Sequence, residues 1–209
     1  MKLNLGSGLL GKSSPWSGDD WLNMDFAAFE ADKGDWSLAK YLDWDMGQLP
    51  WPIESDSVDC IFASHVFEHF RLEKLTDLLK ECQRVLKIGA PIRIICPDPR
   101  KFITNWQLEN SQFVLECYGE QNWDRWNYGE NLNIGFTDMF FPAHYDHQSI
   151  PCIDYYMIIL IRLGFSKVYE MDYSVTKFPA YFGRASNNDG VCTSMDNRPC
   201  LSWYLEVVK

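Results

Sequence analysis

The sequence predicts an α/β fold with a mostly parallel central sheet, and three observations carry that prediction. Short apolar segments alternate with loops through the first 98 residues. Residues 58–63 are almost continuously apolar, which is typical of strands buried on both faces of a parallel sheet. Between Leu72 and Leu86, apolar residues recur at helical spacing. Strands that alternate with loops and helices in this way favour a parallel sheet.

The predicted elements succeed one another along most of the chain. Strands are expected near residues 3–5, 21–26, 41–45, 58–63, 91–96, 167–173 and 201–208, and helices near 72–86 and 149–163. Gly89 is placed to end the first helix in a left-handed conformation. Ser149 is a suitable N-cap for the second helix, and Gly164 is a suitable residue to end it.

Residues 100–147 interrupt this alternation. They are rich in Trp, Tyr and Phe, mixed with Asn and Gln. We expect this insert to form a lid over the substrate, while the alternative is an extension of the core, because aromatic side chains usually serve packing. The 209 residues suit a single domain over 1–209.

The charge of the chain argues against a nucleic-acid partner. The formal net charge is −10 and the isoelectric point is about 4.8. Such a surface repels phosphate backbones, and Lys and Arg are scattered along the sequence rather than gathered in one stretch.

Cysteine usage and apolar runs indicate the compartment. Seven cysteines form no C-x-x-C pair, and Cys60 and Cys96 stand in apolar runs, where cysteine acts as a small buried side chain. This is typical of a reducing environment. The sequence opens without a signal-peptide pattern, and the apolar run 155–163 is too short to span a bilayer. The expectation is a cytoplasmic protein without a membrane partner.

A glycine-rich turn comes after the first strand and fits three ligand-binding patterns. Gly6, Gly8 and Gly11 match the dinucleotide pattern G-x-G-x-x-G, and Gly6 with residues 11–13 matches the phosphate-loop pattern G-x-x-x-x-G-K-S. The Gly-Ser-Gly turn after a strand also fits the first motif of S-adenosylmethionine-dependent methyltransferases. Both phosphate-binding patterns require a helix directly after the turn. Residues 12–20 instead contain Pro15 and no apolar periodicity. The two phosphate-binding patterns are therefore disfavoured, but they stay open as alternatives.

Polar residues stand where several predicted strands end. Asp25 lies seventeen positions after Gly8, so its carboxylate could accept hydrogen bonds from both hydroxyls of a ribose. Asp45 could accept a hydrogen bond from an adenine amino group, with Met46 against the ring. Ligands bind outside the carboxyl ends of strands in open parallel sheets. An acidic site with aromatic faces also suits a sulfonium ion.

With these residues the chain resembles the class I S-adenosylmethionine-dependent methyltransferases, especially their type-11-like branch. The resemblance covers residues 2–98 well and 144–173 loosely. Its most specific parts are the Ser-His…Glu-His segment at 64–69 and the Leu-Lys-Ile-Gly turn at 86–89. It implies a Rossmann-like class I methyltransferase fold with a mostly parallel central sheet, an antiparallel last strand and helices on both faces.

The resemblance also implies S-adenosylmethionine as the cofactor and assigns residues to it. Gly6, Ser7 and Gly8 would lie against its methionine part, with Asn4 and Leu5 leading into that turn. Asp25, followed by Phe26, would hold the ribose, Asp45 and Met46 the adenine, and Ser64 and His65 the methionine end. Many family members carry an acidic residue where this chain has Asn4, and the first helix is nearly absent. The amino-acid end of the cofactor would therefore be held differently.

Four residues are candidates for proton transfer. His144, Asp146 and His147 lie at the end of the insert, and Asp98 comes after the strand at 91–96. A hydroxyl or protonated amine acceptor benefits from a base, whereas a neutral nitrogen needs none. His65 and His69 are expected to make structural contacts near the start of the helix at 72–86. A metal site from His144, Asp146 and His147 lacks a further ligand at convincing spacing, so no metal is expected.

The resulting prediction is a methyltransferase that acts on a small-molecule acceptor, with sugar or cell-envelope metabolites suggested by the branch it resembles. An NAD(P)-binding Rossmann oxidoreductase is one alternative, and a module that binds S-adenosylmethionine without turnover is another. The sequence leaves the acceptor atom and the oligomeric state open.

Overall fold

The computed structural model of the 209-residue chain describes residues 1–7, 20–26, 40–110, 112–113, 147–185, 191–192 and 200–209. The predicted sites Gly8 and His144, and most of the insert 100–147, lie outside these described residues.

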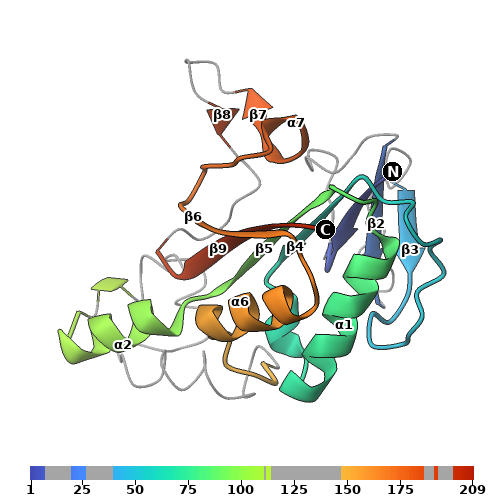
Figure 1. Cartoon of the computed structure of the whole chain (residues 1–209). Coiled ribbons are helices and arrows are strands. Elements are labelled where there is room, and N and C mark those ends of the chain that lie inside the picture. Colours follow the sequence, from blue (N-terminus) through green and yellow to red (C-terminus); the bar gives the residue numbers. More distant parts are fainter. Residues whose placement is uncertain (8–19, 27–39, 111, 114–146, 186–190, 193–199) are drawn as a thin grey trace.

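One seven-stranded sheet forms the centre of the molecule, in the order β3-β2-β1-β4-β5-β9-β6 (Figure 1). Its strands are β1 (Lys2–Leu5), β2 (Trp21–Asp25), β3 (Lys40–Asp43), β4 (Cys60–Ser64), β5 (Pro91–Pro97), β6 (Lys167–Met171) and β9 (Ser202–Val208). The five strands from β3 to β5 pair in parallel, and β9 pairs antiparallel with both β5 and β6. The predicted mostly parallel sheet with an antiparallel last strand is therefore confirmed.

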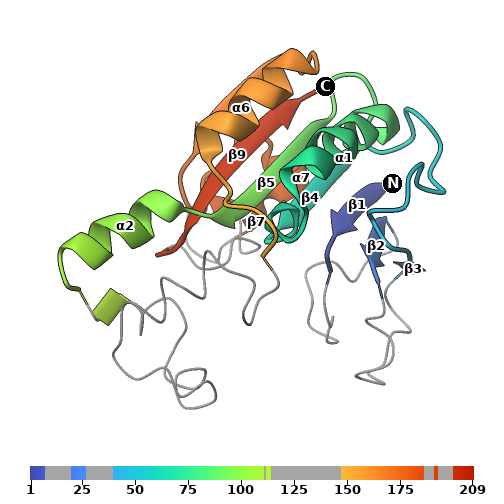
Figure 2. The ribbon, with the colours of Figure 1, turned by 90° about the horizontal axis from the view of Figure 1, so that it is seen from below.

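Helices lie on both faces of this sheet. The described helices are η1 (Phe67–His69), α1 (Leu72–Val85), α2 (Pro99–Gln107), α6 (Ile153–Arg162) and the single-turn α7 (Pro179–Phe182). α1 and α6 cover one face, while α7 and the small hairpin of β7 (Arg184–Ala185) and β8 (Val191–Cys192) lie on the other (Figure 1). α2 reaches outward beyond the sheet, as Figure 2 shows.

The two faces are packed by alternate residues of each strand, because successive side chains of a strand point to opposite sides. Along β4, Ile61 and Ala63 belong to the main core with α1 and α6. Cys60 and Phe62 belong to a smaller cluster on the other face, which Phe182 of α7 completes.

A buried ion pair ties the segment after β6 to that second face. Arg93 of β5 and Glu206 of β9 are both fully buried and meet at 2.7 Å. Arg93 also donates to the Val175 carbonyl at 3.0 Å, and Glu206 accepts from the Thr176 hydroxyl and, at 2.8 Å, from the Lys177 amide. The 172–178 segment is therefore fixed beside the carboxyl end of β6.

Two predicted details differ from the structure, and one helix was not predicted. α1 ends at Val85 with Leu86 extended, so Gly89 does not end the helix; at φ +79° it forms the turn into β5 instead. α6 begins at Ile153 with Cys152 as N-cap, so the Ser149 cap was wrong, whereas Gly164 does come after its end at φ +88°. α2 was not predicted, although Asp98 caps it and Pro99 opens it, which is a recognised start signal.

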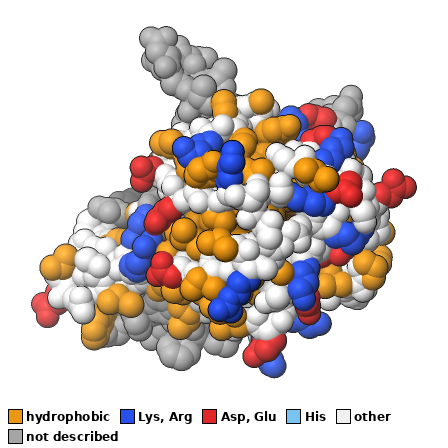
Figure 3. All heavy atoms as spheres, in the orientation of Figure 1, with side chains coloured by type: hydrophobic (Ala, Val, Ile, Leu, Met, Phe, Trp, Pro, Cys, Tyr) orange, Lys and Arg blue, Asp and Glu red, His pale blue; other side chains and the backbone are white. Residues whose placement is uncertain are grey.

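Among the described helices none is both long and apolar enough to cross a membrane. The surface in Figure 3 carries Lys and Arg interspersed with Asp and Glu. Among the described residues, Cys60, Cys82, Cys96 and Cys152 are free thiols.

Candidate active site

The first cavity lies where β1, β2 and β4 end. It has a volume of about 250 Å³ and is lined by Gly6, Asp25, Met46, His65, Val66, His69 and Phe70. Because these three strands are parallel neighbours, the residues just beyond them meet at one edge of the sheet. The first cavity thus stands at the position where open parallel sheets bind ligands.

Gly6 shapes the wall of the first cavity through its backbone. Its φ is +63°, a conformation that side chains disfavour, and its amide donates to the Met24 carbonyl at 2.9 Å. A Cβ at this position would lie 2.4 Å from Cγ2 of Val66. Only glycine therefore lets the turn after β1 approach the turn after β4 this closely.

Asp25 supplies the carboxylate of the first cavity. It is half-buried at the end of β2, and its Oδ1 accepts from the Phe26 amide at 2.7 Å. Burial, together with the charges of Asp25 and then Asp43, raises the pKa of Tyr41 to about 12. Tyr41 therefore keeps its proton near Asp25, at the end of the sheet where β2 and β3 pair.

The loop that carries Met46 is pinned to α1. The indole nitrogen of Trp51 donates to the Met46 carbonyl at 3.0 Å, and the Trp51 amide donates to Oε1 of Glu81 at 2.6 Å. Arg84 donates to both oxygens of Glu81 and to the carbonyl of Ile53. The hydrogen bond from Arg84 holds the pKa of Glu81 below its usual value, so this carboxylate stays ionised at neutral pH.

His65 connects the first cavity to the interior. It has a positive φ of 55°, which is uncommon for a residue with a side chain, and its amide donates to the Ile95 carbonyl at 2.8 Å. Nε2 lies 2.9 Å from Oγ of Ser202, and Nδ1 lies 3.2 Å from Oε1 of Glu68. Contacts on both ring nitrogens fix the orientation of the imidazole.

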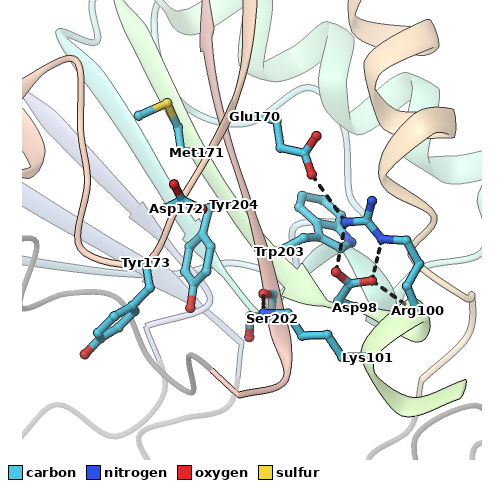
Figure 4. A pocket seen from close by; sticks show the side chains of 10 residues that line it. All are labelled: Asp98, Arg100, Lys101, Glu170, Met171, Asp172, Tyr173, Ser202, Trp203 and Tyr204. Atoms are coloured by element: carbon cyan, nitrogen blue, oxygen red, sulfur yellow. Dashed lines mark hydrogen bonds and ion pairs between the residues drawn. The ribbon is translucent and has the colours of Figure 1, made fainter. Parts of the chain in front are cut away.

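A second cavity of about 340 Å³ lies farther along the same edge, where β5 and β6 end and β9 begins (Figure 4). It is lined by residues from three distant parts of the chain: Asp98, Arg100, Lys101, Glu170, Met171, Asp172, Tyr173, Ser202, Trp203 and Tyr204. The rings of Tyr173 and Tyr204 lie side by side, with centroids 6.1 Å apart.

Ion pairs organise the charged side of the second cavity. Arg100 donates to both carboxylate oxygens of Asp98 at 2.9 Å and to Glu170 at 3.3 Å. Asp98, in turn, caps α2 by accepting from the Arg100 amide. Lys101 donates to the Ser202 carbonyl at 2.7 Å. The two basic side chains are thus held by neighbours, and Figure 4 shows the tyrosine hydroxyls pointing away from this cluster.

Ser202 links the two cavities. Its hydroxyl contacts His65, a lining residue of the first cavity, while Ser202 itself lines the second. One hydrogen bond therefore separates the two cavities at this point.

The predicted cofactor residues divide into two groups. Gly6, Asp25, Met46 and His65 come together in the first cavity. The others described stand nearby without lining it: Asn4, Leu5, Ser7, Phe26, Asp45 and Ser64. Asn4 is buried and donates to Asn23 at 3.0 Å, and Leu5 packs in the core. The Asp45 carboxylate accepts from the Gly47 amide at 2.8 Å.

The described catalytic candidates are both buried. Asp98 lines the second cavity. His147 lines neither cavity and packs edge-on against His69, with ring centroids 5.0 Å apart.

Sequence reasoning did not assign Val66, His69 and Phe70 to the first cavity. They belong to the turn and η1 after β4, and no local pattern reveals that this turn folds back across the glycine turn. The Glu-His pair at 68–69 was a signal, but the sequence suggested only a structural contact for His69.

Comparisons with known proteins agree with this architecture. Residues 19–94 match the family model of a methyltransferase domain. An S-adenosylmethionine-dependent methyltransferase from Archaeoglobus fulgidus is 14% identical at a TM-score of 0.56, over 99% of this chain and 85% of that one. YcgJ from Bacillus subtilis is 11% identical at a TM-score of 0.53, over 99% of this chain and 90% of that one. Another methyltransferase of this kind, from Mesorhizobium loti, is 13% identical at 0.53, over 99% and 89%.

At these identities the structures establish the fold, and no curated protein matches the chain. The family match includes most residues of the first cavity but begins after Gly6. It ends at residue 94, before every residue of the second cavity.

Proposed function

We propose that this chain is an S-adenosylmethionine-dependent methyltransferase that binds its cofactor in the first cavity and a small-molecule methyl acceptor in the second. The contact between His65 and Ser202 carries the proposal, because it brings the two cavities together at one edge of the sheet. Methyl transfer requires a donor and an acceptor held in alignment, and two adjoining cavities provide for both.

The first cavity suits the cofactor in charge and shape. Asp25, which lines this cavity, would accept hydrogen bonds from the ribose hydroxyls, and the turn at Gly6 would hold the methionine part. Met46 would lie against the adenine, and Asp45, which stands nearby without lining the cavity, would accept from its amino group. The bound cofactor supplies an electrophilic methyl group on a sulfonium centre. His65 fixes the end of the cavity that faces the acceptor.

The second cavity favours a polar acceptor that is neutral or positively charged. Three carboxylates (Asp98, Glu170 and Asp172) line it together with two basic side chains, Arg100 and Lys101. Both basic groups already hold protein oxygens, so the described lining presents no unshared positive charge to a phosphate or polyanion. Its volume lies within the range of small-molecule sites, and aromatic walls suit a sugar ring. Sugars are therefore the first class of acceptor to test.

In this proposal the described residues contribute to the reaction mainly by aligning the methyl donor with the acceptor, and less by acting as a general base. Both oxygens of Asp98 accept hydrogen bonds from Arg100. This favours a role for Asp98 in positioning Arg100 rather than in accepting a proton from the substrate. His147 lines neither cavity. His144, which lies outside the described residues, stays a candidate base for an acceptor that must lose a proton.

The insert 100–147 closes over the acceptor in this proposal. Its first helix, α2, contributes Arg100 and Lys101 to the second cavity. Phe113, near the end of the described part of the insert, packs on Phe102 of the same helix with ring centroids 5.0 Å apart. Cleavage of the chain within 114–146 is expected to leave cofactor affinity intact and to abolish turnover. Loss of cofactor affinity would instead make the insert part of the core.

Calorimetric titration with S-adenosylhomocysteine, followed by a transfer assay, tests the proposed function. The assay uses S-adenosylmethionine with a labelled methyl group and separate panels of sugars, amines and carboxylic acids. We expect binding at one site per chain and label transfer to a neutral or cationic acceptor. Binding without transfer to any panel would favour a non-catalytic module. Binding of NAD or NADP alone would favour the oxidoreductase alternative.

A further inference from the structure

Glu68 has an unusual environment for a carboxylate. Its side chain is fully buried between β4 and α1, and neither of its oxygens has a hydrogen-bond partner within the described part of the chain. Nδ1 of His65 lies 3.2 Å from Oε1. Oε2 is left without a donor among the same residues. Burying an ionised carboxylate is costly unless a cation or hydrogen bonds compensate it.

Two further histidines lie at the same place. Ligand atoms of Glu68, His69 and His147 all lie within 4.8 Å of one another. His69 is half-buried, and His147 is only 7% exposed. The amides of Gln148 and Ser149 donate to the Glu68 carbonyl at 2.8 and 3.1 Å, so the backbone itself holds His147 against η1.

We propose that Glu68, His69 and His147 form a binding site for one divalent transition-metal ion beside the first cavity. Two imidazole nitrogens and one carboxylate oxygen are a common ligand set for Zn²⁺ and Fe²⁺. The three ligand atoms, which lie within 4.8 Å of one another, draw closer by up to about 1.4 Å, because ligands at roughly 2.1 Å from a tetrahedral ion lie about 3.4 Å apart. Oε2 of Glu68 meets the ion, while Oε1 stays beside His65.

The position of the site gives it a role in the fold. His69 lines the first cavity, and His147 stands at the end of the insert. An ion between them links the wall of the first cavity to the insert. Three protein ligands also leave at least one coordination position for water or for a polar atom of a bound molecule.

This site could not be expected from sequence spacing. Glu68 and His69 are adjacent, but His147 is 78 positions further along the chain. The sequence instead grouped His147 with His144 and Asp146, and that group lacked a further ligand. The chain contains four histidines, so the contribution of each can be tested separately.

The test measures metal content of the full chain without cofactor. Protein stripped with a chelator is dialysed against Zn²⁺ or Co²⁺, and bound metal is counted by elemental analysis. We expect one equivalent per chain, and a Co²⁺ absorption spectrum without a thiolate charge-transfer band. Affinity falls by more than about tenfold in each of His69→Ala and His147→Ala. Glu68→Gln also loses the metal, and if that buried variant fails to fold, the two histidine variants still decide the matter.

Cys152→Ser is the matched control, because Cys152 is an exposed thiol that could bind zinc adventitiously. It retains the full equivalent if the site is correct. Binding well below one equivalent by wild-type protein, or unchanged affinity in both histidine variants, would overturn the metal site. Neither result bears on cofactor binding, which calorimetry with S-adenosylhomocysteine measures independently.

Discussion

The two cavities, which lie along one edge of the sheet, are formed by different kinds of segment. The first is formed by turns that come directly after β1, β2 and β4, and most of its residues fall within the matched family segment. The second draws on residues near 100, 170 and 203, all beyond that segment. The proposed cofactor site therefore falls largely within the matched segment, and the proposed acceptor site lies wholly outside it.

The cavities also differ in how their loops are anchored. On α1, the buried Glu81 and the partly exposed Arg84 hold the loop of Met46 beside the first cavity. Arg93 of β5 and Glu206 of β9 are fully buried, and together they hold the 172–178 segment beside the second cavity. Burial makes the second anchor far more sensitive to the loss of one partner.

The largest effect is expected from Arg93→Met. This change leaves Glu206 as an uncompensated buried charge, which typically costs about 3–5 kcal/mol of unfolding free energy. Urea unfolding measures it. Arg93→Met combined with Glu206→Gln should recover part of the loss, because Gln removes the charge and can still accept from Thr176. If Arg93→Met lost less unfolding free energy than Glu81→Gln, the buried anchor would not be the more sensitive of the two.

Gly6→Ala should have the next largest effect. Positive φ costs an L residue roughly 1–2 kcal/mol, and the clash of its Cβ with Val66 adds roughly 1–3 kcal/mol. Thermal unfolding and calorimetry with S-adenosylhomocysteine should both show the loss. Gly89→Ala is the control, since Gly89 has a similar φ but no atom within 4 Å of the added Cβ. Equal destabilisation in the two variants would mean that close approach at Gly6 is unimportant.

Asp25→Ala should weaken cofactor binding more than tenfold, because a charged hydrogen-bonding partner contributes roughly 1.5–3 kcal/mol. Titration calorimetry gives the value directly. Asp43→Ala is the matched control: it is paired in register with Asp25 on the neighbouring strand but does not line the first cavity. Equal losses in both variants would point to general electrostatics rather than to the ribose contact.

The smallest effect is a pH dependence at Glu81. Its folded-state pKa is lowered by Arg84, so its contribution is complete above the unfolded pKa of about 4.3 and is lost as pH falls through the folded value. The contribution should be about 1 kcal/mol, since Arg84 is partly exposed. Unfolding of wild type and Glu81→Gln should differ constantly between pH 5 and 7 and converge in acid. A difference that persists unchanged at low pH would exclude the carboxylate as its source.

The fold was largely predictable because its signals are local. Apolar runs indicated the strands, helical spacing between Leu72 and Leu86 indicated α1, and resemblance indicated the antiparallel last strand. Where competing local signals existed, the prediction failed: Ser149 resembles an N-cap, yet α6 begins at Ile153. Asp98 and Pro99 fit the end of the strand at 91–96 as well as the start of a helix, so the local sequence does not decide between them.

The candidate site was predictable only in part, for a physical reason. Residues at the ends of neighbouring parallel strands must meet, so Gly6, Asp25 and His65 could be grouped from sequence. The contact between His65 and Ser202 spans 137 positions, and no spacing rule anticipates it. Ser202 comes near His65 because β9 inserts antiparallel beside β5.

A crystal structure with S-adenosylhomocysteine tests the division between the two cavities most directly. We expect adenosine density in the first cavity, with the ribose hydroxyls at the Asp25 carboxylate and the sulfur on the side of His65 and Ser202. Density for the adenosine between Tyr173 and Tyr204 in the second cavity would contradict this division.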